Sequence, residues 1–373
     1  HRREPVVNNR ASTAVPLGFA RRIDWGVVLV EGRALIGLLL IMAIFTILSP
    51  NFLQPESLIL MTRHVAMNAL LALGMLLVVL NGGIDLSVGS TVGLTGVVAG
   101  LMLRGVSIPG TGITAYAPIW VIVIVAMAVG ALIGWINGVV VTRWRVAPFI
   151  ATLGMLNVAR GIALLGTNGV PITDELKGNP NLGNTGFIPL LAGAPLGIPM
   201  PVWVMVVFAI IFSLLVNRTP FGRWLYAMGG NARAAGLSGV PTRRTETWIY
   251  VISGLCAAAV GLLLTADLPA ATPRAGDSYE LNAIAAVVIG GASLAGGRGT
   301  VRGTVIGAFL VGFLVDGLVL IGLSVFWQQI IKGAVIILAV ALDQLQQSIQ
   351  ARSAMKRAAQ ASLAGRENPA PAK

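Results

Sequence analysis

The clearest shortage in this sequence is charge. Of its 373 residues only 11% are Asp, Glu, Lys or Arg, whereas 56% are hydrophobic and the mean hydropathy is +0.84. A water-soluble protein of this length needs far more polar side chains to cover its surface. The composition therefore excludes soluble enzymes and soluble binding proteins.

Metal-binding, redox and nucleotide-binding residues are also scarce. The chain has two histidines, His1 and His64, and one cysteine, Cys256, too few for a zinc site of the usual kind or an internal disulfide. No Gly-x-x-x-x-Gly-Lys-Ser/Thr motif and no nucleophile elbow with a histidine partner occurs. We expect no cofactor and no catalytic residue in this chain, so any ATP hydrolysis belongs to a partner.

What the sequence has in abundance is long apolar runs, which recur from end to end and approach the length that spans a bilayer. They are continuous rather than alternating, which excludes a membrane β-barrel. The sequence predicts an all-α polytopic membrane protein with about ten transmembrane helices. The predicted spans are 34–49, 65–81, 86–103, 118–141, 147–165, 199–216, 246–266, 281–295, 303–322 and 326–343.

The net charge of +12 is distributed unevenly between the loops, which predicts their orientation. With the N-terminus in the cytoplasm, nineteen Lys and Arg residues fall on the inside, and only Arg63, Arg104, Lys177 and Arg274 fall outside. Basic residues favour the cytoplasmic side of a membrane. Both termini are therefore predicted to be cytoplasmic, and no nucleic-acid partner is needed to explain the charge.

The segments outside the spans complete the predicted organisation. Residues 1–30 form a basic cytoplasmic tail without the pattern of a cleaved signal peptide. The transmembrane domain covers 31–345, with a long outside loop at 166–198 that is suited to turns, and the longest inside loop at 217–245. Residues 346–373 form a second cytoplasmic tail, predicted to be disordered.

The inside loop contains a pattern typical of a short helix. Asn231 can cap its N-terminus, the following residues favour helix, Gly239 suits the C-terminal turn and Pro241 stops continuation. Such a helix, rich in small residues, can accept another protein surface. The alternative is a solvated connector that only caps itself.

The stretch "NGGIDLSVGS", Asn81–Ser90, places an acid between two apolar runs. Asp85 or Ser87 is predicted to cap the next helix, whose N-terminal dipole favours an acid. Gly89, Gly93, Gly96 and Gly100 then share one helix face, which allows close approach of a neighbouring helix. Helix packing is the favoured role of Asp85, and a role lining the transport pathway is the alternative.

A second glycine-rich inside turn, "IGGASLAGGRGTVRGTVIGAFLVG", is again followed by stacked glycines, Gly299, Gly303 and Gly307. The recurrence of a glycine-rich inside turn followed by regularly spaced glycines indicates an internal repeat. The residues assigned to the translocation pathway or to helix packing are Asp85, Ser87, Gly89, Gly93, Asn282, Gly290, Gly291, Gly299 and Gly303.

Charged residues inside apolar runs are expensive in lipid and often functional. Asp316 and Lys332 lie in neighbouring predicted spans, and Arg160 lies close to Asn157 on one helix. We expect an Asp316–Lys332 ion pair. The alternative to this structural pairing is a stand-alone ion-coupled carrier in which Asp316, Lys332 and Asp85 take part in coupling.

Several long motifs, from about the second span to the last, resemble one family, the ribose/xylose/arabinose-type permease subunits of bacterial ABC importers. They are "GGIDLSVGS" (82–90), "GGNARAAGLSGV" (229–240), "LNAIAAVVIGGASLAGGRGTVRGTVIGA" (281–308) and "WQQIIKGAVIILAVALD" (327–343). The resemblance implies the ten-helix type II importer fold of the vitamin B12 permease class, in a bacterial inner membrane.

The resemblance also implies partners. A permease of this kind forms a homodimer, binds two ATPase subunits that carry ATP and Mg, and receives a monosaccharide or polyol from a periplasmic binding protein. It further implies that the inside helix is the coupling helix that meets the ATPase: Asn231, Ala232, Arg233, Ala234, Ala235, Gly236, Leu237, Ser238 and Gly239. The outside loop 166–198 is assigned a docking role for the binding protein. The sequence does not indicate which sugar is carried.

Overall fold

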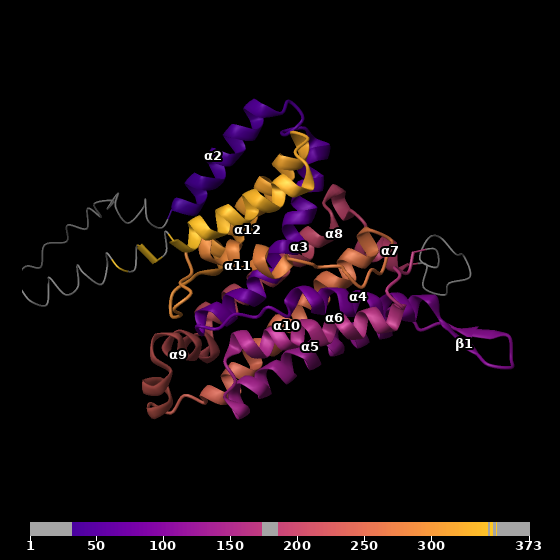
Figure 1. Ribbon diagram of the computed structural model, residues 1–373, viewed down its shortest axis with the longest axis horizontal. Coiled ribbons are helices and arrows are strands. Elements are labelled where there is room, and N and C mark those ends of the chain that lie inside the picture. Colours follow the sequence, from indigo (N-terminus) through magenta and orange to yellow (C-terminus); the bar gives the residue numbers. More distant parts are fainter. Residues whose placement is uncertain (1–31, 174–185, 342–343, 346–347, 349–373) are drawn as a thin grey trace, which may run out of the picture. The chain divides into compact units, whose positions relative to one another are not determined.

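The apolar runs fold into helices in the computed structural model, which describes residues 32–173, 186–341, 344, 345 and 348 (Figure 1). In chain order the elements are α2 (Arg33–Leu48), α3 (Pro55–Leu80), α4 (Val88–Arg104), β1 (Val106–Ile108), β2 (Ile113–Ala115), α5 (Ile119–Trp144), α6 (Pro148–Thr167), α7 (Phe187–Leu191), the 3-10 turn η1 (Pro195–Gly197), α8 (Met200–Arg218), α9 (Pro220–Leu237), α10 (Thr242–Asp267), α11 (Tyr279–Ile289), α12 (Val301–Leu320) and a C-terminal helix, Val325–Ala341.

Each of the ten predicted spans coincides with one of these helices, and the chain is a helical polytopic membrane protein. Six of the described helices, α3, α5, α6, α8, α10 and α12, are long and apolar enough to cross a bilayer by themselves. The helices at the other four predicted spans are apolar but shorter, with 11 to 17 residues each. The predicted tails at 1–30 and most of 346–373 lie outside the described residues, as does the middle of the loop at 166–198.

Three helix boundaries and one loop differ from the prediction. Helix α3 begins at Pro55 rather than at residue 65, because proline suits the first helical turn and the polar residues that follow do not interrupt the helix. Helix α11 ends at Ile289, where glycines with positive φ begin an irregular turn. Helix α9 extends the predicted short helix back to Pro220, and the outside loop contains α7 although turns were expected there.

The connection between α4 and α5, which lies between the predicted spans 86–103 and 118–141, forms the one β-hairpin of the described residues. Strand β1 pairs antiparallel with β2, with Val106 opposite Ala115 and Ile108 opposite Ile113. The hairpin turns at Gly110 and Gly112, both with positive φ. It adds only a small exception to the all-α prediction.

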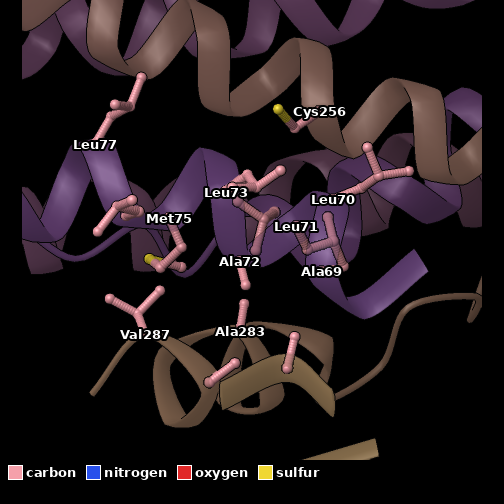
Figure 2. Close-up of a cluster of buried hydrophobic side chains, with 14 of the residues drawn as sticks. Ala69, Leu70, Leu71, Ala72, Leu73, Met75, Leu77, Cys256, Ala283 and Val287 are labelled. Carbon is pink, nitrogen blue, oxygen red and sulfur yellow. The ribbon is translucent and has the colours of Figure 1, made fainter. Parts of the chain in front are cut away.

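The described residues from Ala34 onward belong to one compact unit, and its most buried long helices are α3 and α10. Nearly all side chains of α3 from Val65 to Leu80 are buried. Figure 2 shows the α3 side chains lying between Cys256 of α10 on one side and Ala283 and Val287 of α11 on the other. These helices therefore position the candidate site described below.

Small residues set the distance between α5 and α10, which run side by side (Figure 1). Gly130 meets the backbone of Gly254, Gly134 meets the backbone of Tyr250, and Gly138 meets Thr247. A side chain at any of these three glycines would overlap the facing helix. Close backbone approach through glycine is the usual means of helix association in lipid, where burial of apolar surface gives no driving force.

Candidate functional site

The chain between α3 and α4 carries the buried acid that the sequence singled out. The side chain of Asp85 is 1% exposed, and its carboxylate accepts three hydrogen bonds. Asp85 Oδ1 accepts from the backbone N of Ser87 at 3.0 Å and from Ser87 Oγ at 2.7 Å, and Oδ2 accepts from Ser253 Oγ of α10 at 2.9 Å. Through these hydrogen bonds Asp85 attaches the irregular segment 81–87 to the middle of α10.

The predicted capping of α4 by Asp85 or Ser87 is wrong in its geometry. Ser87 occupies the N-cap position of α4, but no side chain accepts a capping hydrogen bond there. Asp85 instead binds the amide of Ser87, two residues ahead, and the hydroxyl of a different helix. Tertiary contact with Ser253 decides the position of the carboxylate, and sequence spacing did not reveal this partner.

Further hydrogen bonds extend this network to two more helices. Asn137 Nδ2 of α5 donates to Ser87 Oγ at 2.9 Å, and Asn137 is 1% exposed. Thr152 Oγ1 of α6 donates to the carbonyl of Ile84 at 3.1 Å. Buried polar groups in an apolar interior are costly unless they are satisfied, so this network fixes the segment 81–87 against α5, α6 and α10. Polar residues within apolar runs were the available signal for Asn137 and Ser253.

The predicted glycine face of α4 is confirmed. Gly89 contacts the backbone of Gly276, and Gly93 lies against the carbonyls of Pro273 and Ala275. Gly96 meets Gly261 and Thr265 of α10, and Gly100 meets Ala271. One face of α4 therefore receives both α10 and the loop that links α10 to α11.

A guanidinium closes that loop against α6. Arg160 Nη1 donates to the carbonyls of Pro273 at 2.5 Å and Ala275 at 2.9 Å, and Arg160 Nη2 pairs with Asp277 Oδ1 at 2.5 Å. The neighbouring Asn157 donates instead to the backbone of Leu153. Because backbone carbonyls of the 273–275 loop hold the guanidinium, Arg160 positions this loop over the glycine face of α4.

The second set of predicted glycines joins α11 to α12. Gly290 and Gly303 meet backbone to backbone, and Gly307 contacts the carbonyl of Ala286. Gly299, in the turn before α12, lies against Ala292 and Leu76, and Gly291 has φ +97° at the end of α11. Asn282 lies partly exposed in the first turn of α11. The stacked-glycine prediction holds for this pair of helices.

The two glycine-rich turns and α9 meet at one junction, at the predicted cytoplasmic end of the helices. The amide of Gly297 donates to the carbonyl of Leu80 at 2.9 Å, and Gly229 of α9 contacts both Leu80 and Gly297. Tyr226 Oη, also on α9, donates to the carbonyl of Gly299 at 2.8 Å. Burial raises the pKa of the Tyr226 phenol, so the group stays a neutral donor.

Beyond this junction α9 bends and leaves the other helices. Asn231 has extended φ/ψ of −159° and 96°, and its Oδ1 accepts from the amide of Ala234 at 2.9 Å. Gly239 has φ +86° and ends the turn, and the amide of Val240 donates to the carbonyl of Ala235. The predicted cap, helix and stop of this short segment are confirmed as local structure.

Most of that short helix faces outward. Of the residues 231–239 only Ala235 is buried, while Leu237 is 86% exposed at its end. In Figure 1 the bend separates the two halves of α9. The segment therefore presents a small, rigid and largely uncovered surface that is anchored to the junction by the first half of α9.

The predicted Asp316–Lys332 pair is wrong. Asp316 Oδ1 of α12 lies 3.3 Å from His64 Nδ1 of α3, and the adjacent Arg63 pairs with Asp267 of α10 at 2.6 Å. These two pairs tie α3 to α12 and to α10 near their predicted outer ends. Sequence reasoning missed His64 and Asp267 as partners, because they are about 200 to 250 residues distant along the chain.

No metal centre is indicated. Within the ranges that the structure describes, His, Cys, Asp and Glu side chains never gather in groups of three that could hold a metal ion. The polar networks described above consist of single acids paired with hydroxyls, amides or basic side chains. Their arrangement is suited to holding helices and loops in place.

Comparison with known proteins gives consistent matches over most of the chain. The family model described as "Branched-chain amino acid transport system / permease component" matches residues 57–340. The chain is 44% identical over 319 residues to the ribose import permease protein RbsC of Escherichia coli (strain K12), covering 86% of this chain and 95% of that protein.

Two other relatives extend the comparison. The chain is 44% identical over 326 residues to RbsC of Bacillus subtilis (strain 168), covering 87% of this chain and 96% of that protein. It is 37% identical over 321 residues to the galactose/methyl galactoside import permease protein MglC of Escherichia coli (strain K12), covering 85% and 94%. No solved structure matches the chain.

The family match at residues 57–340 covers the helices from α3 onward, the Asp85 segment, the glycine-rich turns and α9, and leaves α2 outside. They confirm the resemblance drawn from the four sequence motifs. The chain belongs to the branched-chain amino acid transport system permease component family, as a membrane-embedded, non-catalytic permease subunit of an ABC transporter.

Proposed function

We propose that this chain forms the pathway by which a monosaccharide or related polyol crosses the bacterial inner membrane, driven by ATP hydrolysis on a separate subunit. The relatives named as ribose and galactose import permeases support the substrate class. One structural observation carries the driven mechanism: a small exposed helix, Asn231–Gly239, fixed to the junction of the two glycine-rich turns.

The proposed architecture is that of a type II importer with ten transmembrane helices. Residues 31–345 form the permease domain, and the tails 1–30 and 346–373 lie in the cytoplasm with the loop 217–245. Four short apolar helices are compatible with this count, because a helix of fewer than 18 residues can cross when neighbours or irregular segments complete its depth. The irregular segment 81–87, buried against α5, α6 and α10, completes α4 in this way.

The Asn231–Gly239 helix is the proposed coupling surface for the ATPase, which holds ATP and Mg. Its outward residues are small except for Arg233 and Leu237, so an approaching surface can contact the backbone closely. Leu237, 86% exposed, supplies an apolar anchor at the tip. The burial of Ala235 assigns that residue to the support of the helix rather than to contact with the partner.

A short series of backbone contacts links this helix to the membrane-embedded helices. Gly229 lies against Leu80, the last residue of α3, and Leu80 leads directly into the segment that holds Asp85. Backbone-to-backbone contact at Gly229 and Gly297 contains no flexible side chain to absorb a displacement. We infer that rocking of α9 is transmitted to α3 and to the Asp85 segment, which supports a packing role for Asp85, Ser87, Gly89 and Gly93.

Two further parts of the assembly follow from the proposed type II architecture. The permease pairs with a second copy of itself, and a periplasmic binding protein delivers the sugar to the outer side, where loop 166–198 lies. Helix α6 and the C-terminal helix Val325–Ala341 carry largely exposed apolar side chains in a single chain. Disulfide crosslinking of single cysteines placed on these helices tests the dimer, and its absence for every pair would contradict it.

The experiment for coupling uses two leucines with similar exposure, 86% and 90%, on opposite predicted sides of the membrane. Leu237→Asp changes the coupling helix, and Leu196→Asp, at a residue 90% exposed in the outside loop, is its control. We expect Leu237→Asp to abolish co-purification with the ATPase and ATP-driven uptake in liposomes. Leu196→Asp keeps the ATPase bound.

Two results would overturn the proposal. Retention of the ATPase by Leu237→Asp at the wild-type level would remove the coupling role from this helix. Accumulation of sugar by the chain alone, under a proton or sodium gradient and without nucleotide, would identify an ion-coupled carrier instead.

A further inference from the structure

A groove of about 780 Å³ runs along the outer surface of the helices between α5 and α10. Its walls are a stripe of α5 from Ala128 to Arg143 and a stripe of α10 from Arg243 to Leu255, each recurring every three or four residues. The network described above does not use these side chains. The glycine contacts of α5 with α10 and the 3.3 Å contact between Thr142 Oγ1 and Thr247 Oγ1 close the floor of the groove.

The groove is chemically divided along its length. Its predicted cytoplasmic mouth carries three exposed arginines, Arg143, Arg243 and Arg244. Above them the walls are aliphatic and aromatic, and the rings of Trp135 and Trp248 are 52% and 58% exposed. No acidic side chain of the described ranges forms an ion pair with any of the three arginines.

The dimensions correspond to one leaflet of a bilayer. From Arg143 to Ala128 the helix rises about 22 Å, at about 1.5 Å per residue, and half of a hydrocarbon core is about 15 Å. A ligand with its charge at the arginines would therefore place an apolar tail along the whole upper part of the groove. Tryptophan rings at this level are typical of membrane interfaces.

We propose that this groove binds an anionic phospholipid of the cytoplasmic leaflet, with its phosphate at Arg143, Arg243 and Arg244 and one acyl chain between Trp135 and Trp248. Three convergent cations next to an apolar slot fit a charged headgroup with a hydrocarbon tail. A free anion would leave the apolar part unfilled, and a zwitterionic lipid would bring a cation to a site that already holds three. Because Arg243 and Arg244 lie only four and five residues after Gly239, the end of the proposed coupling helix, the bound lipid adjoins the proposed ATPase contact.

The test is lipid titration of the purified, delipidated chain by native mass spectrometry, with phosphatidylglycerol and phosphatidylcholine of identical acyl chains. Each arginine near the headgroup is expected to contribute about fivefold. We expect wild-type protein to prefer phosphatidylglycerol on the order of 100-fold, and the variant Arg143→Gln/Arg243→Gln/Arg244→Gln to lose this preference. Equal binding of the two lipids by wild type, or an unchanged preference in the triple variant, would overturn the proposal.

A matched control separates the site from the overall charge. Arg218→Gln/Arg223→Gln/Arg302→Gln removes the same charge from exposed arginines of α8, α9 and α12, outside the groove. This control is expected to keep the lipid preference. Loss of the preference in both triple variants would assign it to general surface charge and contradict a specific site.

Two further measurements address the alternative occupants. Ala131→Trp fills the apolar wall without changing charge and is expected to weaken phosphatidylglycerol binding at least tenfold, whereas inorganic phosphate is expected not to compete. Competition by phosphate, or full lipid binding by Ala131→Trp, would make the arginines a simple anion site. A change of oligomeric state in the arginine variant with lipid binding intact would show that a second copy covers the groove.

A measurement on the unaltered chain covers the case in which the triple variant does not fold. Brominated phosphatidylglycerol in nanodiscs is expected to quench more tryptophan fluorescence than brominated phosphatidylcholine. The difference should disappear in Trp135→Phe/Trp248→Phe. Equal quenching by the two brominated lipids would contradict the proposal.

Discussion

Helices α5 and α10 pack against each other along most of their length, yet they have opposite environments. Helix α5 is the more apolar of the two. Of the residues in its most apolar stretch only 28% are buried, whereas the corresponding share in α10 is 89%. The same contrast separates α8, at 22%, from α3, at 83%. In each of these two pairs the more apolar helix faces outward, although α6, the least apolar of the six long helices, is also only 17% buried. The buried helices α3 and α10 carry small and polar side chains in their interiors.

The difference follows from the solvent. Lipid is as apolar as leucine, so burying an apolar side chain in the protein gains little, whereas a polar group must find a partner inside. Ser253 of α10 and Asn137 of α5 are buried because each has a hydrogen-bond partner. Burial in this molecule is therefore indicated by small and polar residues rather than by hydropathy.

The largest effect is expected from a substitution that forces α5 away from α10. Gly134→Leu would place a side chain against the backbone of Tyr250, so we expect a loss of about 3 kcal/mol of unfolding free energy or more, and little folded protein. Gly154→Leu, on the outer part of α6, has open space around it and is the control. Thermal unfolding in detergent measures both, and equal stabilities would show that α5 and α10 do not depend on this contact.

The second effect concerns the buried acid. Asp85→Ala leaves the hydroxyls of Ser87 and Ser253 and the amide of Ser87 without their acceptor, which should cost about 3 kcal/mol. Asp277→Ala removes an acid that is 57% exposed in its pair with Arg160, and should cost about 1 kcal/mol or less. Chemical denaturation in mixed micelles compares them. The packing role of Asp85 would be refuted by a loss no larger than that of Asp277→Ala.

A third pair of variants sharpens the contrast within one outward-facing helix. Phe212 of α8 is 3% exposed and stacks on Phe208, while Ile210 is 56% exposed. Phe212→Ala should cost about 3 kcal/mol through lost packing, and Ile210→Ala no more than about 0.5 kcal/mol because lipid replaces the methyl groups. Melting temperatures in the same detergent test this, and a reversed order would contradict the assignment of the two faces.

The smallest change in unfolding free energy is expected for two Tyr→Phe substitutions. Tyr226→Phe removes the hydrogen bond to Gly299 and should cost about 1 kcal/mol. Tyr250→Phe should be neutral or slightly stabilising, since its buried hydroxyl has no hydrogen-bond partner among the described residues.

Tyr226 also gives this comparison a pH dependence. Burial raises the pKa of Tyr226 above its value in the unfolded chain, about 10. Its contribution to stability is complete below that pH and falls as the pH rises toward the folded-state pKa. The difference between wild type and Tyr226→Phe should therefore shrink in alkaline buffer. A constant difference would show that the phenol is not the group responsible.

Caps, turns and helix faces could be predicted from the sequence where the interacting residues are close along the chain. The Asn231 cap, the Gly239 turn and the glycine face of α4 depend on residues within three to eleven positions of one another, and each lies where it was expected. The apolar helices at the ten predicted spans were also predictable, since each run is continuous. Helix ends at Pro55 and Ile289 were misjudged, because hydropathy does not mark where a turn begins.

Partners that are distant along the chain were decided only by the tertiary structure. Sequence composition determined a helical membrane protein, because the length of the apolar runs is a property of the chain itself. That His64 rather than Lys332 lies beside Asp316, and that Ser253 holds Asp85, depends on which helices become neighbours. Helix neighbours are selected by the packing of small residues across the whole bundle, and no local pattern contains that information.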